Sequence, residues 1–113
     1  MLASGSLDRR VTLLQRQISK GALNSDVEAW PEFGTVWASY KPVSDGERMR
    51  SAEVAATIEA RFQIRWSEGV SVIDPTWRLR FAGRDWDVVA VKEIGRHEGI
   101  EISAAARADR VAS

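Results

Sequence analysis

Few residues in this chain have the types and spacing that catalysis or metal binding requires. The only histidine is His97, in the sequence GRHEG, and no nucleophile or second ligand stands near it. Catalytic and metal-binding histidines need such partners, so we expect an exposed turn residue. Asp85 and Asp87 could form an acid–base pair, but their alternation with Trp86 predicts the solvated face of a strand. No phosphate-binding glycine loop is present. The sequence predicts no enzyme, cofactor or metal site.

Aromatic residues and arginines are the next candidates for binding. The chain has five tryptophans, and aromatic rings beside arginines can stack on the bases of single-stranded nucleic acid. Most of the large rings, however, are in phase with aliphatic residues of their own strands, namely Phe62, Trp66, Trp77, Phe81 and Trp86. This phase favours the core. Trp30 could fix the loop that contains it, whereas both faces remain open for Trp37.

Four arginines occupy outward positions on two predicted strands. Arg61 and Arg65 lie on one strand, and Arg78 and Arg80 lie on the next. If these strands pair, the arginines form a basic patch that could dock an acidic partner. A solvated face, balanced by acidic neighbours such as Glu59, is the equally supported alternative.

Composition limits the classes of protein that the chain can be. It has 113 residues, which is one domain (1–113), with 44% hydrophobic and 28% charged residues, as in a folded globular chain. There is no cysteine and no segment near the roughly 20 apolar residues of a membrane span. Sixteen basic and sixteen acidic residues give zero net charge. Dedicated nucleic-acid binders usually carry a basic excess, so protein partners are favoured and no membrane is expected.

Two strands are predicted in the first part of the chain. Residues 9–18 (RRVTLLQRQI) are rich in β-branched residues and leucine, and residues 35–43 (TVWASYKPV) form a second strand that ends near Pro42, which cannot donate to a sheet. Residues 19–33 (SKGALNSDVEAWPEF) between them predict a long polar loop.

A β-hairpin is predicted over residues 76–94. Gly83 and Arg84 suit the two central positions of a type II′ turn. The residues expected on its inward face are Trp77, Leu79, Phe81, Trp86, Val88 and Ala90.

The strongest alternation is in residues 57–66, and a final strand follows a turn at residues 95–99. Their expected inward residues are Ile58, Ala60, Phe62, Ile64, Trp66, Ile100, Ile102 and Ala104. Together these elements predict an all-β, mainly antiparallel fold, a small six-stranded barrel or sandwich.

A charged excursion, residues 43–56, separates the second and third predicted strands. Ser44 and Glu47 have the spacing of a capping box, which predicts the start of a short helix. Its apolar face is narrow and rich in alanine, so such a helix would be marginal alone. Two interpretations stay open: an arm that a partner orders, or a surface helix over the end of the barrel.

The order of these signals resembles a known family. The segments GSLDRRVTLLQR, VWASYKPVSDGER, ARFQIRW, DPTWRLRFAGRDWDVVAV and EISAAA, over residues 5–106, resemble the phage head–tail joining (head-closure or stopper) proteins. These occur in long-tailed phages, prophages and gene transfer agents. The likeness depends on the order and spacing of the segments, because no single one is diagnostic.

The resemblance implies a structural protein in the neck of the virion, assembled in the host cytoplasm. It implies a homo-oligomeric ring below the portal or adaptor that closes the DNA exit channel after packaging and offers a surface to a tail-terminator or other tail-completion protein. Contact with exiting DNA would be transient. The arm would contact the channel or a neighbouring subunit through Ser44, Asp45, Glu47, Arg48, Arg50 and Glu53.

One alternative function remains from the residues themselves. A small β-barrel that binds single-stranded nucleic acid would show salt-sensitive binding. It would also need aromatic residues on the face that carries the arginines.

Overall fold

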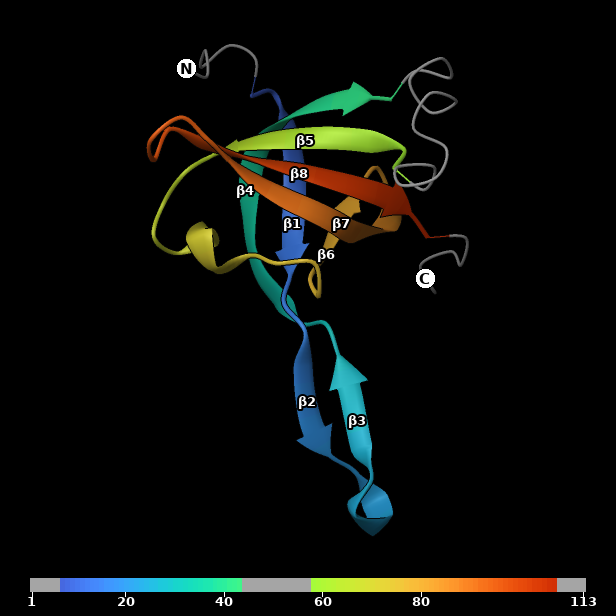
Figure 1. The fold of residues 1–113 in the computed structure, drawn as a ribbon. Helices are drawn as coiled ribbons and strands as arrows, with labels where there is room; N and C mark the ends of the chain where they lie inside the picture. The colour runs from blue at the N-terminus through green and yellow to red at the C-terminus, as the bar shows by residue number, and fades with distance from the viewer. Residues whose placement is uncertain (1–6, 44–57, 108–113) are drawn as a thin grey trace.

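The fold is a closed six-stranded antiparallel barrel with a two-stranded hairpin extending from it (Figure 1). It is seen in a computed structural model that describes residues 7–43 and 58–107. The barrel strands are β1 (Arg9–Leu14), β4 (Glu32–Pro42), β5 (Ala60–Arg65), β6 (Arg78–Phe81), β7 (Arg84–Ile94) and β8 (Gly99–Ala106). They neighbour one another in the order β1-β4-β5-β8-β7-β6, and β6 closes onto β1. The predicted all-β, six-stranded fold is confirmed.

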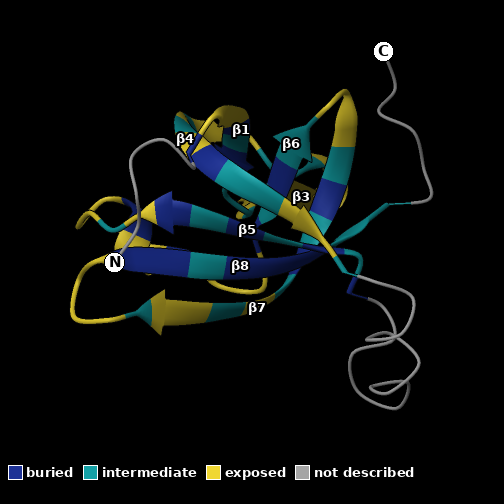
Figure 2. Ribbon diagram, turned by 90° about the horizontal axis from the view of Figure 1, so that it is seen from above, coloured by how far each residue is buried: buried dark blue, intermediate teal, exposed yellow. Residues whose placement is uncertain are grey.

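The inward residues of the barrel strands fill the interior. Figure 2 shows the buried stretches along these strands. Phe62, Leu79 and Ile102 are fully buried, and the rings of Tyr40, Phe62, Phe81 and Trp86 pack against one another at centroid distances of 4.9–6.4 Å. Closure leaves no open edge in the barrel, so its stability does not depend on a partner strand. Except for Ala90, the residues predicted to point inward are buried or pack against the core.

The prediction for Ala90 is wrong because β7 contains a bulge. Val88 pairs with Ala104 and Ala90 pairs with Ser103, so Val89 is an extra residue in the strand. A bulge moves every later side chain to the other face of the sheet. Ala90 is therefore exposed, and Val91 packs against the core in its place.

The turn between β6 and β7 also differs from the prediction. Phe81 pairs with Arg84, which leaves Ala82 and Gly83 as the two central residues. Their φ angles are 56° and 77°. Positive φ at both positions is the pattern of a type I′ turn, whose twist matches that of the flanking strands. The predicted type II′ turn, centred on Gly83 and Arg84, is wrong by one residue.

The predicted polar loop at residues 19–33 is mostly a β-hairpin. Strands β2 (Gln17–Lys20) and β3 (Asp26–Ala29) pair with each other, and a short 3₁₀ turn (Ala22–Asn24) joins them. Figure 1 shows this hairpin extending away from the barrel. All eight residues of its two strands are exposed. The loop prediction is wrong because a strand without a buried face lacks the apolar alternation by which strands are recognised.

Candidate functional site: a hairpin and a basic groove

The four outward arginines do not form a single patch. Strand β5 lies between β4 and β8, and β6 lies between β7 and β1. In the closed order of six strands, two other strands separate β5 from β6 on either side, so the two strands do not pair. Arg61 and Arg65 are therefore separated from Arg78 and Arg80. Because the predicted patch required β5 and β6 to pair, that arrangement is wrong, and docking by any of these arginines stays a prediction.

The wall that carries Arg78 and Arg80 is balanced by carboxylates. Arg80 Nε lies 3.1 Å from Asp85 Oδ1, and Arg78 Nε lies 3.4 Å from Asp87 Oδ1. Arg107 Nη1 donates to the same Asp87 oxygen at 2.8 Å. Asp85 and Asp87 thus lie on the outward face, as predicted, and act as counterions to arginines.

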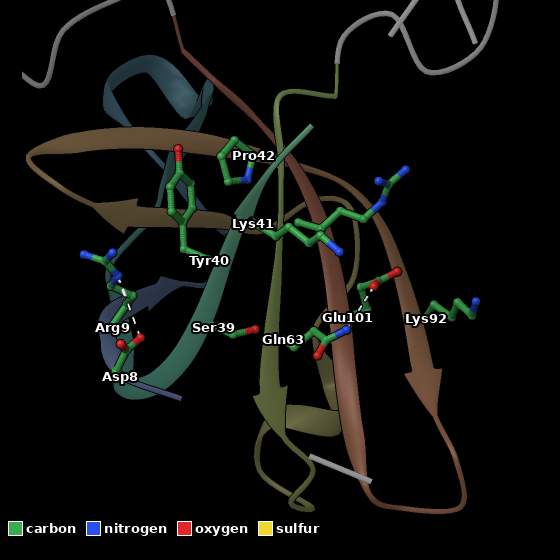
Figure 3. Close-up of a pocket in the computed structure, with 10 residues that line it drawn as sticks. Asp8, Arg9, Ser39, Tyr40, Lys41, Pro42, Gln63, Lys92 and Glu101 are labelled. Carbon is green, nitrogen blue, oxygen red and sulfur yellow. Dashed lines mark hydrogen bonds and ion pairs between the residues drawn. The ribbon is translucent and has the colours of Figure 1, made fainter. Parts of the chain in front are cut away.

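A groove of about 790 Å³ lies on the side of the barrel that carries Arg61, and we refer to it below as the groove (Figure 3). It lies over the outer faces of β4, β5, β8 and β7, beside the start of β1. Its charged lining consists of Arg9, Lys41, Arg61 and Lys92 together with Asp8 and Glu101. Lys41 and Arg61 are directly opposite each other on β4 and β5. The groove is thus a locally positive region on a chain of zero net charge.

His97 is an exposed turn residue, as predicted. Its ring stacks on Trp66 at a centroid distance of 3.9 Å, and its backbone N–H donates to Glu93 Oε2 at 2.7 Å. In residues 7–43 and 58–107, no three His, Asp or Glu side chains gather as metal ligands would. No helix within these residues is long and apolar enough to span a membrane.

The tryptophans do not form a base-stacking platform. Trp77 and Trp86 are buried, and Trp66 is half-buried against the core. Trp37 is the exposed one, at 52%, and the Arg10 guanidinium lies 4.7 Å above its ring. A single ring already covered by a guanidinium does not offer the successive rings along which a nucleic-acid strand stacks.

The β2–β3 hairpin, residues 17–29, has one charged and one uncharged face. Opposite residues of an antiparallel pair share a face. Lys20 and Asp26 pair on the charged face at 2.8 Å, and Glu28 accepts from Arg16 Nε at 2.9 Å. The uncharged face holds Gln17, Ser19, Val27 and Ala29. The ionic groups of the hairpin are thus paired, Lys20 with Asp26 and Glu28 with Arg16 just before β2, whereas its other face and its tip carry no charge.

The tip of the hairpin presents an apolar side chain on strained backbone. Leu23 is 99% exposed, and its φ angle is 59°. Asn24, at 64°, follows it in the same left-handed region. Asparagine tolerates this region, whereas for leucine it is unfavourable by about 1–2 kcal/mol. Neither burial nor local geometry explains a leucine at this position.

The base of the hairpin is fixed to the barrel by Trp30. Its Nε1 donates to the Thr76 carbonyl at 2.9 Å, and the Arg78 guanidinium lies 3.5 Å above its ring. Asp74 holds the loop of Thr76, because its carboxylate accepts from the Thr76 hydroxyl and from the Thr76 N–H. These two hydrogen bonds, the hydroxyl first, lower the pKa of Asp74 below its ordinary value. Trp30 therefore fixes its segment, as the sequence suggested.

The predicted arm lies almost wholly outside the described residues. Ser44, Asp45, Glu47, Arg48, Arg50 and Glu53 are among residues 44–57 and stay predictions. Val43, the last residue before them, donates its N–H to the Glu59 carbonyl at 2.9 Å. This bond extends the pairing of β4 with β5, so the excursion joins two neighbouring strands.

Comparison with known proteins decides the family. The sequence matches the family described as phage head completion protein over residues 2–107. This chain belongs to that family. Membership confirms the resemblance seen in the sequence and assigns the chain a structural role in completing the head of a phage or phage-like particle.

Solved structures support the same fold. Protein SF1141 from Shigella flexneri 2a, known from a solution structure, is 25% identical, with a TM-score of 0.78 over 96% of this chain and 100% of that one. A chain in the virion of a native gene transfer agent particle is 18% identical, with a TM-score of 0.63 over 91% of this head completion protein and 97% of that chain. A search of curated proteins finds no match.

Sequence reasoning missed the hairpin tip and most of the groove. Leu23 is a single apolar side chain between polar neighbours and gives no periodic signal. Lys41 and Lys92 lie in predicted strands, but regular alternation puts Lys92 in phase with Trp86 and Val88, so its exposure follows only from the bulge in β7. Their convergence with Arg61 could not be predicted either, because it depends on which strands become neighbours in the barrel.

Proposed function

We propose that this head completion protein assembles as a ring below the portal or its adaptor, closes the DNA exit channel of the filled head and provides the surface to which the tail attaches. The role is structural, without catalysis. Its partners are the portal or adaptor on one side and a tail-completion protein on the other. Family membership and the closed barrel, which folds without needing a partner strand, support this assignment.

The exposed Leu23 at the hairpin tip carries the proposal. Backbone strain of about 1–3 kcal/mol persists at positions where function requires it. Here it presents a leucine to solvent beyond the barrel, where the leucine stabilises nothing described in the free subunit. A neighbouring protein surface would bury the side chain, and burial of a leucine contributes roughly 1.5–3 kcal/mol. The hairpin is therefore a preformed contact with the next subunit or with another neck protein.

The internal ion pairs of the hairpin support protein docking over nucleic-acid contact. Lys20 and Arg16 are already paired with Asp26 and Glu28, so neither is left to neutralise a phosphate. Affinity for DNA depends on such neutralisation. The exposed Val27 on the uncharged face and Leu23 at the tip instead suit the apolar centre of a protein–protein interface.

We further propose that residues 43–56 contact the channel or the neighbouring subunit, through the side chains predicted from the resemblance. The position of this segment in the chain supports the proposal, because it leaves the barrel between two adjacent strands and does not interrupt their pairing.

A cryo-electron microscopy map of the neck of the parent particle tests the proposal. We expect a ring of this protein between the portal side and the tail, with each hairpin tip seated against another chain. A neck without such a ring, or a ring whose hairpins all point into solvent, would contradict it.

A pair of variants tests the hairpin tip alone. Leu23→Asn removes the apolar contact while suiting the left-handed backbone, so the free subunit should be as stable as before or slightly more stable. We expect the yield of tailed, DNA-filled particles to fall at least tenfold. Val72→Asn makes a similar apolar-to-polar change at an exposed residue of the short 3₁₀ turn (Val70–Val72) between β5 and β6, and serves as the control. Equal particle yields for the two variants would exclude the tip as a contact.

A further inference from the structure

The groove has the composition of a binding surface for an anion-bearing protein segment. Four cationic and two anionic side chains line it, and Ser39 and Gln63 lie between Asp8 and Glu101 (Figure 3). Asp8 lies 3.8 Å from Arg9, and Glu101 accepts from Gln63 at 3.2 Å, so both carboxylates have partners within the groove.

Two of the cations have no ion partner in the described part of the chain. Lys41 and Lys92 are exposed, and no carboxylate of residues 7–43 or 58–107 lies within ion-pair distance of either ammonium group. The third lysine of the chain, Lys20, is paired with Asp26. Lys41 also stands directly opposite Arg61, so a carboxylate placed over Lys41 would lie near two cations.

We propose that the groove binds an extended acidic segment of another protein of the particle. The identity of the partner as a particle protein rests on the proposed head-closure function. Its carboxylates lie over Lys41 and Lys92, and the segment runs across the strands from β4 to β7. The contact adds electrostatic complementarity to the apolar contact of the hairpin, which favours correct pairing among the neck proteins.

Strand pairing defines the path of the segment. Lys41 on β4 and Lys92 on β7 are separated by β5 and β8. The cross-strand row of Lys41 runs through Arg61 and Ser103 to Ala90, whereas Lys92 lies opposite Glu101, two residues further along β7. The segment should therefore cross the strands obliquely, with one carboxylate over Lys41 and another over Lys92.

The lining favours a peptide over DNA. Asp8 and Glu101 would repel a phosphate backbone, whereas they can accept hydrogen bonds from peptide N–H groups. The neutral chain also lacks the basic excess that DNA binding draws on. The exposed Pro42 among the lining residues adds apolar area suited to a peptide.

Zero-length carbodiimide cross-linking of intact particles tests the proposal directly, because it joins a lysine amine to a carboxylate in contact with it. Peptide mass spectrometry should find Lys41 and Lys92 joined to Asp or Glu residues of a different particle protein. Lys20 is the internal control, since it should join Asp26 of its own chain. The proposal is overturned if the Lys20–Asp26 link forms while Lys41 and Lys92 remain unlinked.

A comparison of filled and DNA-free particles distinguishes binding of a protein segment from binding of DNA. Acetylation of Lys41 and Lys92 should be slowed at least fivefold in particles compared with the free subunit, and to the same degree in filled and DNA-free particles. Protection that disappears with the DNA would assign the groove to nucleic acid instead and overturn the proposal.

Charge reversal separates this inference from the proposed function. Lys41→Glu and Lys92→Glu should each lower particle yield at least fivefold, whereas Arg96→Glu, the same change in the exposed turn before β8, should not. If the ring is present in the neck map but both groove variants assemble normally, the groove proposal fails and the head-closure function stands. If no ring is present, the head-closure function itself fails.

Discussion

The barrel and the β2–β3 hairpin use the same secondary structure in opposite ways. Each barrel strand has a neighbour on both sides, and its inward residues fill a common core. The hairpin strands have one neighbour each, and every residue in them is exposed. The barrel therefore gets its stability from burial, whereas the hairpin depends on its base, its turn and two ion pairs. Residues of the hairpin can therefore be substituted without removing any contact of the barrel core.

The largest loss of stability is expected from damage to the core of the barrel. Phe62→Ala removes a fully buried ring that packs against Tyr40, Phe81 and Trp86. The cavity should lower the free energy of unfolding by about 3–5 kcal/mol. Urea denaturation followed by tryptophan fluorescence measures this loss. A loss below about 1 kcal/mol would mean that the barrel core does not hold the fold together.

A local effect is expected at the junction between the two regions. Trp30→Ala removes the hydrogen bond to Thr76 and the contact with Arg78, which together contribute about 1–2 kcal/mol. Hydrogen exchange at Gly21, whose N–H donates to the Ser25 carbonyl, should accelerate several-fold, while exchange in β5 and β8 stays unchanged. Faster exchange throughout the barrel would show that the two regions unfold as one unit.

Removing the hairpin should affect stability less than the core variant does. A variant in which two glycines replace residues 17–29 keeps Arg16 and Trp30 and removes no buried side chain. The free energy of unfolding should change by less than about 1 kcal/mol, because burial is unaltered. Thermal unfolding by circular dichroism gives the answer. Failure of this variant to fold would assign the hairpin a structural role in the free subunit.

The smallest effect is expected from Asp74→Asn, which weakens the loop that receives Trp30. The folded state lowers the pKa of Asp74, so its carboxylate stabilises the fold above the ordinary pKa of 3.8, and this contribution is lost as the pH falls through the folded value. At pH 7 the variant should unfold about 2 °C or less below the parent, since exposed carboxylate interactions are weak. The difference in melting temperature between variant and parent should narrow as the pH falls below 3.8. A gap that widens in acid would contradict the assignment.

Much of the barrel could be predicted from the sequence, whereas its departures from regularity could not. Alternation in residues 57–66 identifies Phe62 and Ile64 as core because a half-buried strand alternates with period two. The bulge at Val89 is not visible in that pattern, since it arises where β7 must follow the curvature of the barrel beside β8. The predicted position of the turn is wrong by one residue because the register of β6 and β7 determines that Ala82 and Gly83 are its central residues.

The sequence by itself determined the all-β class, the aromatic core and the family. These depend on local alternation and on the order of segments along the chain, which any fold must preserve. Only the tertiary structure decided that Arg78 and Arg80 are balanced by carboxylates, that Arg61 faces a groove with Lys41 and Lys92, and that Leu23 stands alone at an exposed tip. The physical reason is that charge balance and exposure depend on which strands become neighbours. Barrel closure, which brings β6 to β1 and β8 to β5, sets those neighbours across the whole chain.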